Sequence, residues 1–62
     1  MIELTKLNGR TFVLNAELIE TIESAPDTII TLTAGKKIVV QETREEVVNK
    51  VIDYRRKING NL

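Results

Sequence analysis

Residues 2–14 read IELTKLNGRTFVL, two apolar-rich runs on either side of Asn8-Gly9. Asn-Gly between such runs marks a tight turn, so this stretch predicts a β-hairpin. A two-residue loop would scatter the apolar side chains over both sides of the hairpin. A three-residue loop, with Gly9 in the left-handed conformation of a G1 bulge, instead places Leu4 opposite Phe12 on one face. We therefore expect the bulged hairpin, with a positive φ at Gly9.

Three further strands are predicted beyond this hairpin. Residues 15–17 interrupt the pattern and predict a turn or a single helical turn. Residues 19–24 are strand-like in spite of an imperfect alternation, and the strand ends at Ala25-Pro26-Asp27, where proline presets a turn. The β-branched segment 28–33 and the segment 37–41 then form a second hairpin across a glycine-containing turn.

A helix is predicted to follow the strands. Thr43-Arg44-Glu45-Glu46 has the spacing of a capping box, in which the Thr43 hydroxyl and the Glu46 carboxylate each accept from the other residue's backbone N–H. Apolar side chains then recur at helical spacing along one stripe, with Tyr54 at its margin: Val47, Val48, Val51, Ile52 and Ile58.

The fold class that follows is mainly β with one helix. About five short antiparallel strands over residues 2–41, two hairpins and one further strand, form a curved sheet or small barrel, and an amphipathic helix covers about 43–58. Both faces of the second hairpin are apolar, because Ile30 and Leu32 share one face while Ile29 lies on the other. One helix covers one face, so the other face either closes into a barrel or meets another subunit. The sequence leaves both arrangements open.

Length and composition set further bounds. A chain of 62 residues predicts a single domain, 1–62, that buries only about 60% of the surface of its unfolded chain. Small domains often gain stability from disulfides, metals or oligomerisation, and this chain has no Cys and no His. We therefore expect a homo-oligomer without metal or cofactor. No apolar run approaches the ~18 residues of a spanning helix, so we expect a cytoplasmic chain without membrane insertion.

The formal charge is zero, but the two halves of the chain differ. Residues 1–31 carry two cationic and five acidic side chains, a net charge of −3, whereas residues 32–62 carry seven and four, a net charge of +3. This asymmetry is compatible with head-to-tail association or with one basic face. A neutral total argues against strong nonspecific binding to nucleic acid.

Candidate site residues are cationic and aromatic. Without His or Cys, no recognisable catalytic constellation remains, so we expect a protein that binds a partner and is not an enzyme. Lys36 and Lys37 at a hairpin turn, with Arg55 and Arg56 near the helix end, form one basic surface if the fold brings them together; otherwise they are ordinary solvated charges. Arg55 falls within the apolar stripe, where it either snorkels past the sheet or reaches a partner's carboxylate. Tyr54 is a core-margin residue or an interface residue.

Several short motifs in combination resemble the FlbD family of small flagellar proteins. The likeness covers nearly the whole chain, from residue 1 to about 57, and it rests on Leu7-Asn8-Gly9, Ile19-Glu20-Thr21-Ile22-Glu23, Pro26-Asp27-Thr28 and Tyr54-Arg55-Arg56. The resemblance implies a cytoplasmic accessory of bacterial flagellar motility, in a family linked to stator function and swarming torque. It carries over no catalytic or binding residue. From the sequence we hypothesise that the basic surface docks on an acidic cytoplasmic loop of a flagellar stator or motor protein.

A second resemblance supplies an alternative function. Leu4-Thr5-Lys6 and Arg44-Glu45-Glu46 are similar to motifs of the carbon storage regulator family, small RNA-binding dimers of five strands and a helix. That resemblance implies that Lys6 and Arg44 flank bound RNA across an interlocked dimer. Lysine stands where that family's first motif has arginine, and the neutral total charge is poor for phosphate binding. The sequence therefore favours protein contacts in motility over RNA binding.

Overall fold

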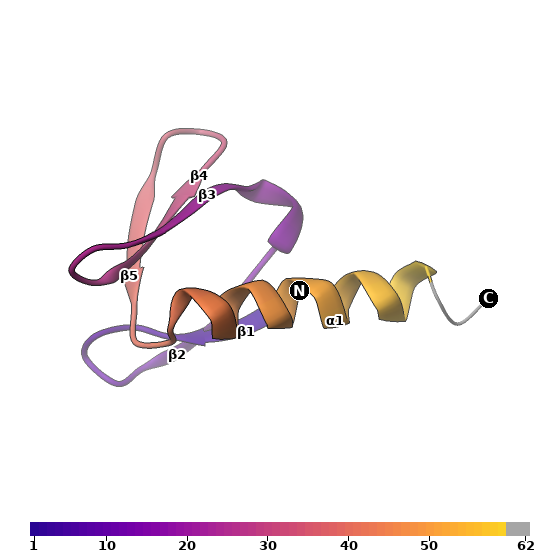
Figure 1. Ribbon diagram of the computed structural model, residues 1–62, viewed down its shortest axis with the longest axis horizontal. Coiled ribbons are helices and arrows are strands. Elements are labelled where there is room, and N and C mark those ends of the chain that lie inside the picture. Colours follow the sequence, from indigo (N-terminus) through magenta and orange to yellow (C-terminus); the bar gives the residue numbers. More distant parts are fainter. Residues whose placement is uncertain (60–62) are drawn as a thin grey trace.

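The computed structural model describes residues 1–59, which form two small antiparallel sheets and a C-terminal helix (Figure 1). The elements in chain order are β1 (Ile2–Thr5), β2 (Thr11–Leu14), the 3₁₀ turn η1 (Ala16–Leu18), β3 (Ile19–Ser24), β4 (Thr28–Leu32), β5 (Lys37–Val40) and α1 (Arg44–Asn59). This confirms the predicted five antiparallel strands and the helix. β1 and β2 form one sheet, and β3, β4 and β5 form the other in that order. Within residues 1–59 the strands do not close into a barrel.

The first hairpin has the predicted bulged loop. Leu4 pairs with Phe12 across the two strands, and Gly9 has a φ of 89°. The Gly9 N–H donates to the Lys6 carbonyl at 2.9 Å, and the Lys6 N–H donates to the Arg10 carbonyl at 2.8 Å. The three-residue loop and its apolar face are thus confirmed.

Replacing Gly9 tests how strongly this loop depends on the left-handed backbone. A Cβ at this position would meet no atom within 4 Å, so the cost comes from the backbone conformation alone. We expect Gly9→Ala to lower the free energy of unfolding by about 1 kcal/mol in urea titrations. Gly9→Asn should lose less, because asparagine tolerates this conformation better. Equal stability of Gly9→Ala and the wild type would contradict the expectation.

A β-bulge explains the imperfect alternation of β3. Ile19 pairs with Leu32 and Ile22 pairs with Ile30, and the register shifts between positions 19 and 21. The extra residue of the bulge allows two residues three positions apart to point to the same face. Ile19 and Ile22 therefore both face the interior beside β4.

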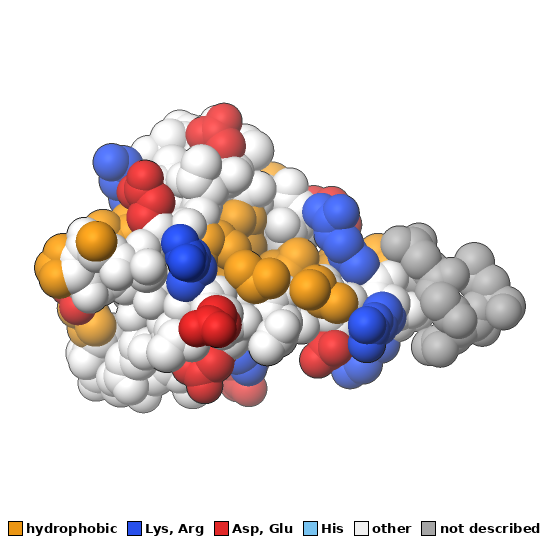
Figure 2. Space-filling model, viewed as in Figure 1, with side chains coloured by type: hydrophobic (Ala, Val, Ile, Leu, Met, Phe, Trp, Pro, Cys, Tyr) orange, Lys and Arg blue, Asp and Glu red, His pale blue; other side chains and the backbone are white. Residues whose placement is uncertain are grey.

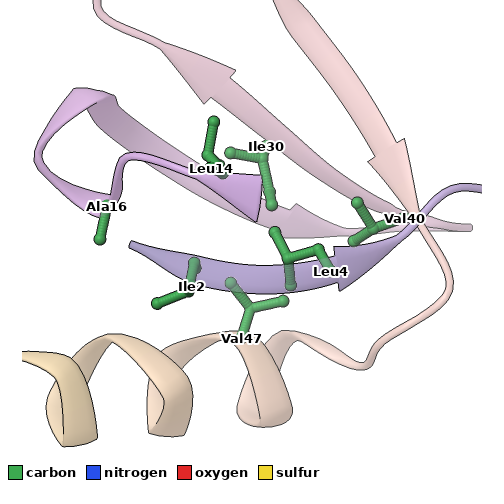
Figure 3. Packing of buried hydrophobic residues seen from close by; sticks show 7 residues of the cluster. All are labelled: Ile2, Leu4, Leu14, Ala16, Ile30, Val40 and Val47. Carbon is green, nitrogen blue, oxygen red and sulfur yellow. The ribbon is translucent and has the colours of Figure 1, made fainter. Parts of the chain in front are cut away.

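The two sheets face each other across a small core (Figure 3). α1 contacts β1 and β3, and Val47 reaches from the helix toward β1 (Figure 3). Leu4, Ile30 and Val47 are 0% exposed. The whole buried apolar set is Ile2, Leu4, Leu14, Ala16, Ile30, Val40 and Val47.

The sheets are joined at one corner, where β5 passes β1. Lys6 and Val40 form an isolated antiparallel bridge, and the Gln41 N–H donates to the Thr5 carbonyl at 2.8 Å. The Glu42 carboxylate accepts from the Thr5 N–H at 3.0 Å and from the Thr5 hydroxyl at 2.8 Å. This corner fixes the direction in which the chain enters α1, so it also places the helix over the sheets.

The capping box begins the helix as predicted. The Thr43 N–H donates to the Glu46 carboxylate at 2.8 Å, and the Glu46 N–H donates to the Thr43 hydroxyl at 3.1 Å. Two backbone donors without helical partners are thereby satisfied. The first helical residue is Arg44, one position after the predicted start of the capping box.

Candidate partner-binding grooves

Among the hollows on the surface formed by residues 1–59, three grooves contain the cationic and aromatic candidates Lys36, Lys37, Tyr54 and Arg55. One lies between the start of β1 and α1 and includes Tyr54. A second lies between α1 and β3 and includes Arg55. The third includes Lys36 and Lys37 and lies where the two hairpins face each other.

The third groove, here the lysine groove, combines cations with an apolar floor. Its floor is half-buried apart from one buried leucine, and three lysines border that floor. The residues that line the groove are Lys6, Phe12, Leu14, Leu32, Lys36, Lys37 and Ile38. The Lys6 ammonium lies 5.5 Å from the centroid of the Phe12 ring, within the range of a cation–π interaction. Among the described residues, α1 contributes nothing to this lining.

The groove between α1 and β3 is almost entirely apolar, and we call it the α1–β3 groove. Arg55 supplies its cation, while the rest of its lining is aliphatic: Ala16, Ile19, Ile22, Val48, Val51 and Ile52. Hydrophobic side chains form a band across the middle of this face, with charged side chains on both sides (Figure 2).

Arg55 has a carboxylate partner within the chain. Its guanidinium lies 3.9 Å from the Glu17 carboxylate on η1, and the two side chains are 60% and 51% exposed. An ion pair this exposed contributes about 0–1 kcal/mol. Arg55 therefore ends beside a carboxylate of its own chain, and its contact with a partner's carboxylate stays a prediction.

Tyr54 lines a different groove from Arg55, although the two residues are neighbours on α1. It is half-buried and packs against the core, which places it at the core margin. It shares its groove with the N-terminal end of β1 and with charged helix residues, among them Lys50 and Asp53. Its part in partner binding stays a prediction.

The two cationic pairs lie on different parts of the molecule. The turn between β4 and β5, which carries Lys36, lies at the top of the view in Figure 1, whereas the C-terminal half of α1, which carries Arg55 and Arg56, extends to the right, away from the strands. Within one chain they do not share a groove. A partner would have to span both regions, or a second copy would have to bring them together, to form one basic surface.

Lys6 and Phe12 are the groove residues that sequence reasoning did not place beside Lys36 and Lys37. The sequence does contain a signal for this placement, because the bulged register pairs Leu4 with Phe12 and strand alternation puts Lys6 on the same hairpin face as Leu4. Arg44, the other residue of the RNA-binding alternative, is exposed at the first position of α1 and does not line the lysine groove. Lys6 therefore lines the lysine groove, whereas Arg44 lies outside it.

In residues 1–59, no group of three or more potential ligands could hold a metal ion. No helix in this range is long and apolar enough to cross a membrane.

These features define a class of protein: a small two-sheet domain with one helix, whose grooves are lined by apolar and cationic side chains. A family model described as flagellar and swarming motility proteins, FlbD, matches residues 1–59, and the chain belongs to this family. The resemblance seen in the sequence is thus confirmed. No curated protein and no solved structure matches the chain.

Proposed function

We propose that this chain is a non-enzymatic, cytoplasmic accessory of the flagellar motor that supports stator torque and swarming by binding a protein partner. Membership of the flagellar and swarming family supports the role in motility. The observation that carries the binding mechanism is the lysine groove, in which three ammonium groups border an apolar floor.

The chemistry of the lysine groove favours an acidic amphipathic segment. Lys6, Lys36 and Lys37 attract carboxylates and steer their approach, while Phe12 and Ile38 offer apolar surface to the segment's other face. A ligand with acidic side chains alone would bury none of the apolar floor of the lysine groove. The proposed partner is therefore an acidic cytoplasmic segment, with interspersed apolar residues, of a stator or motor protein.

The remaining candidates have a secondary place in this proposal. Arg55 and Arg56 contact the same partner only if it extends beyond the lysine groove toward α1. Tyr54 already packs against the core, so its contribution to binding would come from its exposed edge. Lys36 and Lys37 are exposed and do not belong to the core, which makes them the first residues to vary.

We expect Lys36→Glu/Lys37→Glu to abolish swarming in a motile cell that depends on this chain. The reversal places carboxylates opposite the partner's carboxylates, and recovery of stator or motor proteins with the tagged chain should fall about tenfold or more. The measurements are swarm expansion, rotation of tethered cells and mass spectrometry of the captured proteins. Circular dichroism checks that the variant folds.

Arg10→Glu/Arg44→Glu is the matched control, because it makes the same charge change at exposed positions outside the lysine groove. It should swarm and capture partners as the wild type does. Normal swarming of a stably expressed Lys36→Glu/Lys37→Glu protein would refute binding through this groove.

The same capture experiment tests the RNA-binding alternative when the RNA is sequenced as well. Lys6 is shared by both hypotheses, since it lines the lysine groove, so Arg44 is the discriminating residue. A defined RNA set that is enriched by the wild type and lost in the Arg10→Glu/Arg44→Glu control would overturn the proposal in favour of a post-transcriptional regulator.

A further inference from the structure

The α1–β3 groove is an apolar surface that the lysine-groove mechanism does not use. Ile52 and Val48 on the helix are 43% and 39% exposed, although the sequence predicts that their apolar stripe packs on the sheets; within that stripe Val47 is buried, Val51 packs against the core, and Ile58 is 48% exposed. Across the groove, Ile19 and Ile22 are only half-buried. Leu18, which precedes β3, is 44% exposed. Contiguous apolar exposure of this kind marks an interaction surface.

The charges on the two sides of this groove have opposite sign. η1 and β3 carry Glu17, Glu20 and Glu23 and no cation, whereas the last turns of α1 carry Arg55 and Arg56. Figure 2 shows cationic and acidic side chains on either side of the hydrophobic band. The border on η1 and β3 is therefore acidic, and the border on α1 is basic at its C-terminal end.

We propose that the α1–β3 groove is the interface through which two copies of this chain associate about a two-fold axis. A two-fold contact uses the same patch on both copies, so the patch must be complementary to itself. The apolar band meets its own copy, and the basic helix end of each copy comes opposite the acidic β3 of the other. Arg55 and Arg56 of one copy then face Glu20 and Glu23 of the second copy.

Self-complementary charge favours a second copy as the occupant. An unrelated partner would have to present both signs in the opposite arrangement, whereas a second copy of this chain carries both on the same patch. The formal net charge of the whole chain is zero, so two copies approach without net repulsion. A small core also leaves more to gain from burying apolar surface between copies.

The contact is made by side chains in the groove and not by pairing along the edge of β3. β3 is an edge strand of its sheet, but it contains a bulge between positions 19 and 21 and carries Glu20 and Glu23. Bulges and charged residues are devices that discourage edge-to-edge strand pairing. The α1–β3 groove beside this edge is lined by aliphatic side chains apart from Arg55, so these devices do not prevent a contact there.

Sedimentation velocity of the purified chain tests the proposal directly. We expect a reversible dimer with a Kd of about micromolar order, because the apolar band is short. Ile52→Glu should weaken dimerisation by about tenfold or more, since it places an unpaired charge in the centre of the contact. Val13→Glu is the matched control, because Val13 is 63% exposed on β2 and lies outside the groove; it should dimerise as the wild type does.

A charge-swap experiment tests the two-fold arrangement without changing the apolar band. Arg55→Glu/Arg56→Glu has two acidic borders, and Glu20→Arg/Glu23→Arg has two basic borders, so each variant alone should be monomeric. Mixed in equal amounts, they should form a heterodimer, because both contacts are then complementary. Circular dichroism of each variant confirms that it folds.

Three results would overturn the proposal: a wild type that stays monomeric up to about 1 mM, a Val13→Glu variant that loses association as strongly as Ile52→Glu, or swapped variants that do not associate when mixed. These experiments use the purified chain alone. They therefore succeed or fail independently of the proposed motor partner.

Discussion

Leu4→Ala is expected to lower the free energy of unfolding by about 2–5 kcal/mol, the largest effect of any single change considered for this chain. Leu4 is 0% exposed and lies at the centre of the buried set, on the strand between α1 and the three-stranded sheet (Figure 3). Truncation removes its transfer free energy and leaves a cavity that the paired strands cannot collapse to fill. A chain of 62 residues has few other buried side chains to compensate.

The absolute size of this loss matters because the starting stability is small. A core of this size supplies no more than about 3–5 kcal/mol of net stability, so Leu4→Ala should leave much of the protein unfolded at room temperature. Urea or thermal unfolding followed by circular dichroism measures the loss. Leu4→Met, which roughly conserves volume, should cost less than about 1.5 kcal/mol.

Val13→Ala is the control for Leu4→Ala, because Val13 lies on the neighbouring strand with its side chain 63% exposed. Exposed substitutions of this kind change stability by about 0.5 kcal/mol or less. If the two alanine variants lost similar stability, the described core would not be the main source of stability.

Much of the fold was predictable because local patterns determined it. The Asn8-Gly9 turn and the requirement that Leu4 and Phe12 share a face together specified the bulged hairpin. The capping box specified the start of the helix within one residue. In each case the information lies within a few residues of the feature that it determines.

Features that depend on tertiary packing could not be obtained this way. The bulge in β3 follows from the pairing of Ile19 and Ile22 with β4, and the sequence shows it only as an irregular alternation. Whether the strands close into a barrel depends on how the two sheets meet, and that depends on contacts between distant residues such as Thr5 and Glu42. No local pattern predicts a contact across 37 positions.

Only part of the candidate site could be predicted, because the grooves also depend on tertiary packing. Lys36 and Lys37 were identified from their place on a hairpin turn, but their neighbours Lys6 and Phe12 come from the other hairpin. Arg55 was identified from its helical angle, but its nearest carboxylate, Glu17, lies on η1. Sequence patterns found individual residues, and the packing of the hairpins and the helix decided which of them share a groove.

Glu42→Ala is expected to cost about 1–3 kcal/mol at neutral pH, because it leaves the Thr5 N–H and hydroxyl without their acceptor. These bonds join β1 to the segment that leads into α1, so their loss loosens the corner that positions the helix. Unfolding in urea measures the cost. Glu45→Ala, which removes an exposed carboxylate three positions along the chain, should cost no more than about 1 kcal/mol through the helix dipole.

The pH dependence separates the charge of Glu42 from its hydrogen bonds. Partial burial opposes ionisation, but the two hydrogen bonds from Thr5, with smaller contributions from its own backbone N–H and the charge of Lys50, lower the pKa of Glu42 below its usual value of 4.5. A carboxyl with a lowered folded-state pKa stabilises the fold above the unfolded-state pKa, and this contribution is lost as the pH falls through the folded-state value. The stability difference between the wild type and Glu42→Gln should therefore be largest near neutral pH and shrink below about pH 4.5. A difference that stayed constant from pH 7 to about pH 3 would show that the carboxylate's charge contributes nothing at this corner and that Glu42 acts there only as a neutral acceptor.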